Sequence, residues 1–270
     1  MRSGGVRLHG MTTSFLAFTR DVAPSMADCE LTHLDRDPID VATARIQHAG
    51  YERLLGVLGC EVRRVAAAPA HPDAVFIEDT AVVVDEIAVI TRPGAASRRG
   101  ETGGVEAALA GLRPLARIVE PGTLDGGDVL VVGRRVFVGR TARTNDAGIA
   151  QLQAILSAHG YDVIAVDVTG CLHLKSAVTA LDDATVLVNP AWVDAAAFAP
   201  LAAVDVHPEE PMAANVLRVG DQLLYAEAYP RTRSLLEDRG YRLHLVDASE
   251  LAKAEGAVTC CSLILRNVVA

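Results

Sequence analysis

Residues 125–168, DGGDVLVVGRRVFVGRTARTNDAGIAQLQAILSAHGYDVIAVDV, contain one complete structural unit. The segment predicts two short strands joined by a tight turn, then a helix, then a third strand. These lie at Val129–Val132, Gly133-Arg134, Val136–Val138, Asp146–His159 and Tyr161–Val166. Within the helix, Ile149, Leu152 and Leu156 recur at helical spacing, and Gly160 is a typical residue after a helix end. The pattern therefore predicts a ββαβ unit.

The same order of elements recurs along the chain. Similar patterns occupy residues 81–120 and 215–246, and a fainter one occupies residues 176–206. A fifth unit is divided between the chain ends, where a strand at 259–266 is expected to pair with the strand–helix–strand run of residues 15–65. Such pairing closes a ring and removes the exposed sheet edge. A repeat of about 40 to 50 residues is typical of propellers.

We therefore predict an α/β fold, a five-bladed α/β propeller of ββαβ repeats. A single domain is expected over residues 14–270, after a flexible N-terminal extension at residues 1–13. An ordinary mixed α/β fold, with units that resemble one another by accident, remains the alternative.

Composition favours a well-packed protein and excludes several classes of partner. Half of the 270 residues are hydrophobic, which is enough to form a core, and the net charge is -9. The chain has no cluster of basic residues, so binding to nucleic acid or to an anionic membrane is not expected. The longest stretch without Asp, Glu, Lys or Arg, residues 147–161, is too short and too polar to span a bilayer.

The cysteines indicate a reducing compartment. Five cysteines with no Cys-x-x-Cys pair fit neither a disulfide framework nor a zinc ribbon, so we expect a cytoplasmic protein. Cys260 and Cys261 would point to opposite faces of a strand, so only one of them is expected to face a given cavity.

Four segments place polar residues where a packed fold does not need them. They are an apolar strand that ends in Glu78-Asp79, the glycine-flanked carboxylates of residues 123–129, His173 before a strand-like run, and the pair Cys260-Cys261. Taken singly, each has an ordinary explanation as a turn, a structural histidine or a buried thiol. At corresponding ends of successive blades they would converge on the ring axis, which is the usual architecture of an active site.

Six motifs in order carry a specific resemblance. They are FIED (76–79), TRPGAASRR (91–99), LDGGDVL (124–130), RTN (143–145), LHLKS (172–176) and VTCCS (258–262). Over about residues 15–266 the chain resembles the dimethylarginine dimethylaminohydrolases of the guanidine-modifying, or pentein, superfamily. That resemblance implies a five-bladed propeller and hydrolysis of Nω-methylated arginines to citrulline and dimethylamine or methylamine, through a covalent cysteine intermediate with no metal or organic cofactor.

The resemblance also implies catalytic roles. Cys260 matches the nucleophile, His173 the general acid and base, and Asp125 the carboxylate that supports the histidine, where many relatives have Glu. A guanidinium carbon is a poor electrophile, so its attack calls for a soft thiolate and an oriented substrate.

Substrate-binding roles follow in the same way. Glu78 and Asp79 match the residues that bind the guanidinium, and Arg98 and Arg143 match those that bind the α-carboxylate. Asp73 and the backbone carbonyls of Leu31 and Ala254 match the acceptors of the α-ammonium. Leu31 is expected on a front loop, residues 22–37, that covers the pocket.

Other interpretations stay open. The substrate could instead be that of an arginine deiminase or another amidine hydrolase, although 270 residues leave no room for the helical insertion usual in arginine deiminases. A non-catalytic propeller that binds a cationic amino acid is the alternative from another class. The sequence leaves open whether the chain is a monomer or a homodimer, whether zinc inhibits the site, and what Cys29, Cys171 and Cys261 do, with Cys261 expected to be structural.

Overall fold

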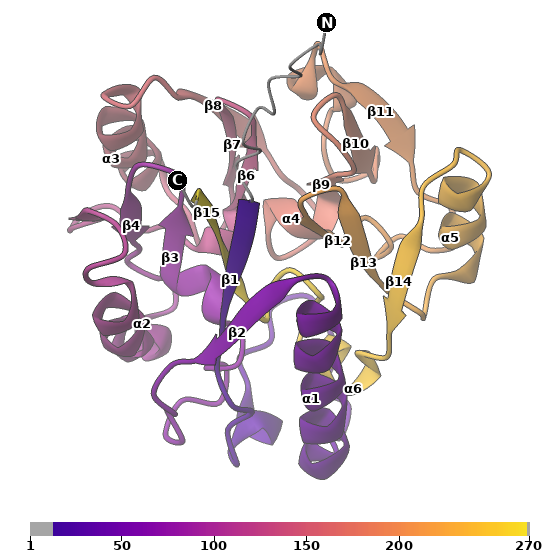
Figure 1. Cartoon of the computed structure of the whole chain (residues 1–270), viewed down its shortest axis with the longest axis horizontal. Coiled ribbons are helices and arrows are strands. Elements are labelled where there is room, and N and C mark those ends of the chain that lie inside the picture. Colours follow the sequence, from indigo (N-terminus) through magenta and orange to yellow (C-terminus); the bar gives the residue numbers. More distant parts are fainter. Residues whose placement is uncertain (1–12, 269–270) are drawn as a thin grey trace, which may run out of the picture.

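The computed structural model describes residues 13–268, which form five three-stranded sheets arranged around a ring (Figure 1). In every sheet the middle strand pairs antiparallel with one neighbour and parallel with the other. This is the pattern of a ββαβ unit, in which a hairpin is followed by a crossover to a parallel strand. The predicted five-bladed propeller is therefore confirmed.

The strands take three positions in each blade. The inner strands are β3 (Ala81–Val83), β6 (Val129–Val132), β9 (Val178–Ala180), β12 (Val216–Val219) and β15 (Leu263–Val268). The middle strands are β1 (Thr13–Thr19), β4 (Ala88–Ile90), β7 (Arg135–Arg140), β10 (Thr185–Val188) and β13 (Gln222–Ala226). The outer strands are β2 (Cys60–Arg64), β5 (Leu115–Arg117), β8 (Asp162–Asp167), β11 (Ala202–Asp205) and β14 (Leu243–Val246). Residues of the inner strands line an axial cavity of about 620 Å³.

Helices cover the outside of the ring (Figure 1). The crossovers are α1 (Val41–Val57), α2 (Thr102–Leu109), α3 (Asp146–Ser157) and α5 (Pro230–Glu237), whereas the fourth blade has only the short η5 (Ala195–Phe198). Asp40 and Asn145 begin α1 and α3 by accepting hydrogen bonds from backbone N–H groups of the first turn. That short crossover explains why the fourth repeat is faint in the sequence.

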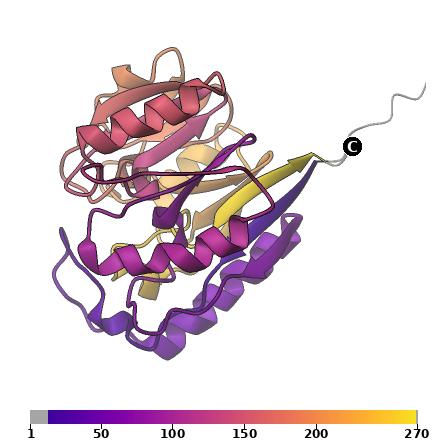
Figure 2. The ribbon, with the colours of Figure 1, turned by 90° about the vertical axis from the view of Figure 1, so that its left-hand side faces the viewer.

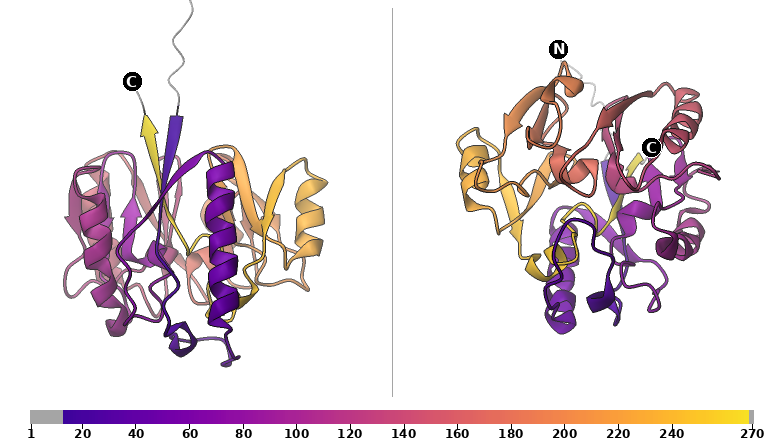
Figure 3. Two further views of the ribbon diagram at one scale, coloured as in Figure 1. Left: turned by 60° about the horizontal axis from the view of Figure 1, so that its bottom comes forward. Right: turned by 180° about the vertical axis from the view of Figure 1, so that it is seen from behind.

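The two ends of the described chain close the ring. β1 pairs antiparallel with β15, with Leu16 opposite Leu265, and parallel with β2. Figure 2 and the left panel of Figure 3 show β1 and β15 side by side. The predicted closure is confirmed, and the predicted extension lies outside the described residues except for Thr13, where β1 begins.

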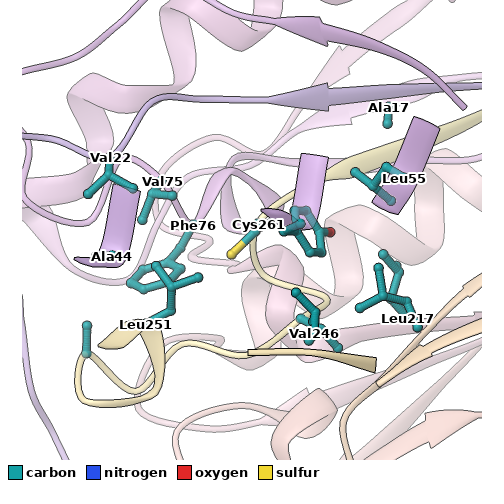
Figure 4. Close-up of a cluster of buried hydrophobic side chains, with 14 of the residues drawn as sticks. Ala17, Val22, Ala44, Leu55, Val75, Phe76, Leu217, Val246, Leu251 and Cys261 are labelled. Atoms are coloured by element: carbon teal, nitrogen blue, oxygen red, sulfur yellow. The ribbon is translucent and has the colours of Figure 1, made fainter. Parts of the chain in front are cut away.

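Apolar side chains pack between neighbouring blades and beneath the helices. Figure 4 shows the cluster in which α1, β1 and the segment before β15 meet, with Cys261 beside Phe76 and Leu251. Cys261 is completely buried, so its side chain belongs to the core. Each fully buried Leu or Phe side chain contributes about 1.5–3 kcal/mol by leaving water.

Two local expectations are wrong. Residues 72–79 form turns and the short helix η2 (Ile77–Thr80) instead of a strand, and α4 (Leu174–Ala177) separates His173 from β9. In both cases a tight turn lies just before an inner strand, which apolar periodicity does not reveal.

The remaining short helices are η1 (Met26–Asp28), η3 (Ala96–Glu101), η4 (Gly126–Asp128) and α6 (Ser249–Ala252). No helix among residues 13–268 is both long and apolar enough to cross a membrane.

Candidate active site

Polar residues precede each inner strand and meet at one end of the ring. Asp79 precedes β3, Asp125 precedes β6, His173 precedes β9, Asn215 precedes β12 and Cys260 precedes β15. This repeated placement produces the convergence predicted from the sequence. The front loop begins at the same end of the ring, opposite to the ends of the described chain (Figure 3, left).

A small pocket at this end holds most of the predicted site residues. Its lining includes Asp73, Asp79, Arg98, Arg143, His173, Ala254 and Cys260, together with Glu30, Phe76, Leu172, Glu255 and Gly256. The larger axial cavity opens on the other side of these residues and contains neither His173 nor Cys260. We therefore place the chemistry in the small pocket.

His173 contacts one buried carboxylate and lies near the charges of two more. Its Nε2 lies 3.0 Å from Asp125 Oδ2, and its Nδ1 lies 3.9 Å from Asp79 Oδ1. Burial lowers the pKa of His173, but the charges of Asp79, Asp128 and Asp125 outweigh burial and raise that pKa to about 9. The imidazole is therefore mainly protonated at neutral pH.

Gly127 allows His173 and Asp79 to approach each other. A Cβ atom at this position would lie 2.6 Å from His173 Nδ1 and 2.8 Å from Asp79 Oδ1. The backbone N–H of Gly127 also donates a hydrogen bond of 2.8 Å to Asp79 Oδ1. The second glycine of the LDGGDVL motif is thus required because a side chain here would collide with both residues.

Cys260 lies in the pocket as a neutral thiol. Burial and the charges of Glu78 and Asp79 raise its pKa to about 12, although Lys175 opposes them. Its backbone is fixed on both sides, because its carbonyl accepts a hydrogen bond from the Glu78 N–H, and Asn215 Oδ1 accepts one from the N–H of Thr259. A positive charge brought beside the sulfur would favour its ionisation.

Asp79 is oriented by Arg98. The Arg98 Nη1 donates to Asp79 Oδ2 at 2.5 Å, while Nε and Nη2 donate to Glu101 and to backbone carbonyls. These bonds leave one of the five guanidinium hydrogens free. The charges of His173 and Arg98 outweigh burial and hold the pKa of Asp79 below its usual range, so Asp79 is an anion.

Arg143 and Asp73 stand further from the nucleophile and connect to the front loop. Arg143 Nη2 donates to Thr32 Oγ1 at 3.2 Å, and Asp73 Oδ2 accepts from the Glu30 N–H at 3.1 Å. Both side chains are more than nine-tenths buried. Burial raises the pKa of Asp73 to about 6 against the opposing charge of Arg98. The pocket thus carries opposite charges suited to the two ends of an amino acid.

Three predicted site residues, Asp125, Glu78 and Leu31, are not among those that line the small pocket, although Asp125 contacts His173 as described above. The Glu78 side chain lies on the axial cavity, where it pairs with Lys175 and accepts a hydrogen bond of 2.9 Å from Thr259. Leu31 is on the front loop and packs on the apolar cluster beside it, but it is not among the residues that line the pocket. Ala254 lines the pocket and also belongs to the same apolar cluster.

Three residues that support the site, Glu255, Asn215 and Asp128, were not predicted from the sequence. Glu255 has a positive φ of 57°, and its carboxylate accepts hydrogen bonds from the N–H groups of Thr32, His33 and Leu34. Asn215 holds Thr259, as described above. Asp128 accepts hydrogen bonds from Thr141, Thr144 and the Leu174 N–H, which lie next to site residues in the chain or contact them. Asp128 is part of the LDGGDVL motif, but the sequence does not indicate which groups donate hydrogen bonds to it.

The polar centre is better suited to an organic cation than to a metal ion. Asp79, Asp125 and His173 offer oxygen and nitrogen atoms within 4.8 Å of one another. However, Arg98 already pairs with Asp79, and Arg143 Nη1 lies 3.8 Å from Asp125. These positive charges oppose a bound metal, whereas a planar guanidinium can share the carboxylates through directed hydrogen bonds.

Comparison with known proteins gives close relatives. The model of the arginine deiminase family matches residues 111–217. A dimethylarginine dimethylaminohydrolase from Streptomyces coelicolor is 46% identical over 257 residues, covering 93% of this chain and 97% of the relative. One from Pseudomonas aeruginosa is 37% identical over 226 residues, covering 83% and 89%.

Solved structures agree with these relatives. A cysteine-to-serine mutant of the Pseudomonas aeruginosa protein, complexed with citrulline, matches with a TM-score of 0.86 at 34% identity and covers 93% of this chain and all of that one. The N-terminal domain of a cyanobacterial arginine dihydrolase matches with a TM-score of 0.84 at 18% identity, covering 93% of this chain and 97% of that one. The second likeness shows a shared fold.

Proposed function

This chain belongs to the dimethylarginine dimethylaminohydrolase family, and on that premise we propose how its own residues act on the substrate. It is a hydrolase of C–N bonds that converts Nω-methylated arginines to citrulline and dimethylamine or methylamine. The observation that carries the assignment of residues is the pocket that brings Cys260, His173 and Asp79 together.

Substrate binding uses charges at both ends of the pocket. Asp79 receives the guanidinium, and Arg143, which is less committed to the protein than Arg98, supplies most of the binding of the α-carboxylate. Arg98 orients Asp79 and donates its one remaining N–H to the α-carboxylate. Asp73 and the carbonyl of Ala254, two residues that line the pocket, receive the α-ammonium, together with the carbonyl of Leu31 from the adjacent front loop. Glu78 acts on the nucleophile through Thr259 and the Cys260 backbone.

The first half of the reaction forms the covalent intermediate. The bound guanidinium favours loss of the Cys260 proton to solvent, and the thiolate attacks the guanidinium carbon. Protonated His173 then donates its proton to the methylated nitrogen, because an amide anion is too basic to leave. The C–N bond breaks, the amine departs and an S-alkylthiouronium remains on Cys260.

The second half releases citrulline. Neutral His173, held by Asp125, takes a proton from water while the water oxygen attacks the thiouronium carbon. The C–S bond then breaks, its electron pair returns to Cys260, and the hydroxyl proton of the adduct passes to the sulfur, which restores the neutral thiol and leaves neutral citrulline. The protonated His173 is ready for the next cycle.

Alkylation and turnover are expected to depend on pH in opposite directions. Because the pKa of free Cys260 is about 12, inactivation by neutral iodoacetamide should be slow at pH 7 and rise with pH. Turnover should fall as pH rises through about 9, because His173 then loses the proton that the leaving amine needs. Inactivation rates and kcat/KM between pH 6 and 10.5 measure both. Fast alkylation at pH 7, or turnover that still rises above pH 9.5, would contradict these assignments.

Arg143→Ala is expected to weaken binding more than chemistry. Loss of a charge-assisted contact of about 1.5–3 kcal/mol predicts a KM roughly 10- to 100-fold higher, with kcat within about threefold. Steady-state kinetics with asymmetric dimethylarginine measure the split. Arg140→Ala, which removes an exposed arginine paired with Asp146 and Asp167, is the matched control. A loss confined to kcat would mean that Arg143 orients the reacting group instead.

The choice of substrate is tested by product analysis. Purified enzyme is incubated separately with asymmetric dimethylarginine, monomethylarginine and arginine, and citrulline and the released amine are quantified. We expect kcat/KM for the methylated substrates to exceed that for arginine. A preference for arginine would assign an arginine deiminase activity, and tight binding without citrulline from any of the three would assign a cationic amino-acid-binding protein or another amidine substrate.

The chemistry of the site also bears on the compartment and the assembly in which the enzyme works. We propose a cytoplasmic enzyme, because Cys260 must remain a free thiol and all five cysteines are unpaired in the structure. We further propose that residues 14–270 form one catalytic domain that acts as a monomer or homodimer on a small-molecule substrate, with no nucleic-acid or membrane partner. The support is the ring closed by β1 and β15 together with the net charge of -9.

A further inference from the structure

Asp128 lies at the centre of a buried hydrogen-bond network beside the pocket. The side chain is completely buried. Its Oδ2 accepts hydrogen bonds from Thr141 Oγ1 at 2.7 Å and Thr144 Oγ1 at 2.6 Å, and its Oδ1 accepts one from the Leu174 N–H at 2.9 Å. Asp128 is not among the residues that line the pocket, so it does not touch the substrate.

Each of these contacts leads to a different residue of the proposed site. Thr144 Oγ1 accepts a hydrogen bond from the Asp125 N–H at 3.1 Å, and Thr141 Oγ1 accepts one from the Arg143 N–H at 3.0 Å. The Leu174 N–H follows directly after His173. One carboxylate therefore joins the backbones of the acid–base histidine, its supporting aspartate and the carboxylate-binding arginine.

The network requires a carboxylate rather than a side chain of the same shape. Three donors point at Asp128, and an ionised carboxylate has acceptor capacity on both oxygens for all of them. An asparagine amide would keep one acceptor oxygen and turn an NH₂ group toward either the Leu174 N–H or the two threonine hydroxyls. The buried donors left unpaired would then move apart or find other partners.

The negative charge of Asp128 also stabilises the protonated form of His173. Asp79 on η2, Asp125 before η4 and Asp128 on η4 all raise the pKa of His173. Two arginines contact the same group: Arg98 pairs with Asp79, and Arg143 Nη1 lies 3.8 Å from Asp125 Oδ2. Burial raises the pKa of Asp128 itself to about 6, although the charge of His173 and the hydrogen bonds from Thr144 and Thr141 oppose this rise.

We propose that Asp128 is a positioning residue that holds His173, Asp125 and Arg143 in their working arrangement, through Leu174, Thr144 and Thr141. The inference rests on the proposed function for the meaning of that arrangement. Its three branches serve different steps of the reaction. The branches through Leu174 and Thr144 serve proton transfer, and the branch through Thr141 serves substrate binding.

The test uses Asp128→Asn together with Thr144→Val and Thr141→Val in the full chain. We expect Asp128→Asn to lower kcat at least tenfold, raise KM and shift the pKa of His173 downward by roughly one unit, because a nearby negative charge is lost. Thr144→Val should mainly lower kcat. Thr141→Val should mainly raise KM and lower kcat to a smaller extent, because Thr141 Oγ1 also accepts a hydrogen bond of 3.2 Å from the Thr144 N–H. Asp167→Asn, which changes an exposed aspartate of the same blade, is the control.

One readout separates this proposal from the proposed function. The His173 pKa, followed by NMR of the imidazole C–H groups in substrate-free enzyme, needs no turnover, so it remains informative if methylated arginine is not the substrate. If Asp128→Asn does not fold, the two threonine variants test the branches separately. The proposal is overturned if folded Asp128→Asn keeps the His173 pKa and both kinetic constants within twofold, or if both threonine variants change kcat and KM equally.

Discussion

Cys260→Ser is expected to abolish turnover of asymmetric dimethylarginine, with a loss in kcat of about 10³-fold or more. A serine hydroxyl is a far weaker acid than a thiol, so a bound guanidinium would not ionise it. The replacement changes one atom in a partly exposed side chain at the pocket, so binding should persist. Steady-state rates and calorimetric titration with substrate measure the two effects.

The neighbouring thiol provides the control for this variant. Cys261 lies in the apolar cluster and is completely buried, so Cys261→Ala should cost stability but leave kcat per folded molecule within about threefold. Near-native turnover by Cys260→Ser, with loss in Cys261→Ala, would reverse the assignment of the nucleophile.

His173→Asn is expected to lower kcat by about 10²- to 10⁴-fold, the usual contribution of a positioned general acid. Asparagine can still donate a hydrogen bond to Asp125, but it cannot protonate the leaving amine. Substrate affinity should therefore change little. Stopped-time kinetics with quantification of dimethylamine measure the loss, and calorimetry measures the affinity.

The control for His173→Asn is a histidine outside the site. His244 lies on β14 and contacts Gln222, so His244→Asn should retain full turnover. An unchanged steady-state rate in His173→Asn would remove this histidine from acid catalysis and transfer the role to another group.

The ring itself was predictable because each blade repeats a local pattern. Apolar runs before and after Gly133-Arg134, followed by the helical spacing of Ile149, Leu152 and Leu156, specify a blade without knowledge of its neighbours. The pairing of β1 with β15 followed from the need to cover the last open edge. The sequence also indicated convergence, because the polar residues precede the same strand in each unit.

The directions of individual side chains could not be predicted in the same way. Glu78 and Asp79 are adjacent on η2, a 3-10 helix with about three residues per turn, so they point roughly 120° apart. Asp79 therefore reaches the pocket, while Glu78 faces the axial cavity and pairs with Lys175. A residue's direction in a tight turn depends on its backbone angles, which hydrophobic periodicity does not encode.

Long-range polar partners were also beyond the sequence. Asp128 meets Leu174 across 46 residues, and Glu255 holds the front loop across more than 200. Arg98 was expected to bind the substrate carboxylate, but its partners Asp79 and Glu101 occupy most of its hydrogen bonds. Only the folded ring brings these groups together. The motifs that contain Asp128 and Arg98 therefore did not reveal what these residues contact, and no motif pointed to Glu255.

The most direct test of the account is to detect the covalent intermediate on Cys260. Enzyme mixed with asymmetric dimethylarginine is quenched in acid within one turnover, and its intact mass and peptides are analysed. We predict a mass increase equal to the substrate minus dimethylamine, located on the peptide that contains Cys260 and absent from Cys260→Ser. Turnover to citrulline with no adduct at any time point, or with an adduct on Cys261, would contradict the account.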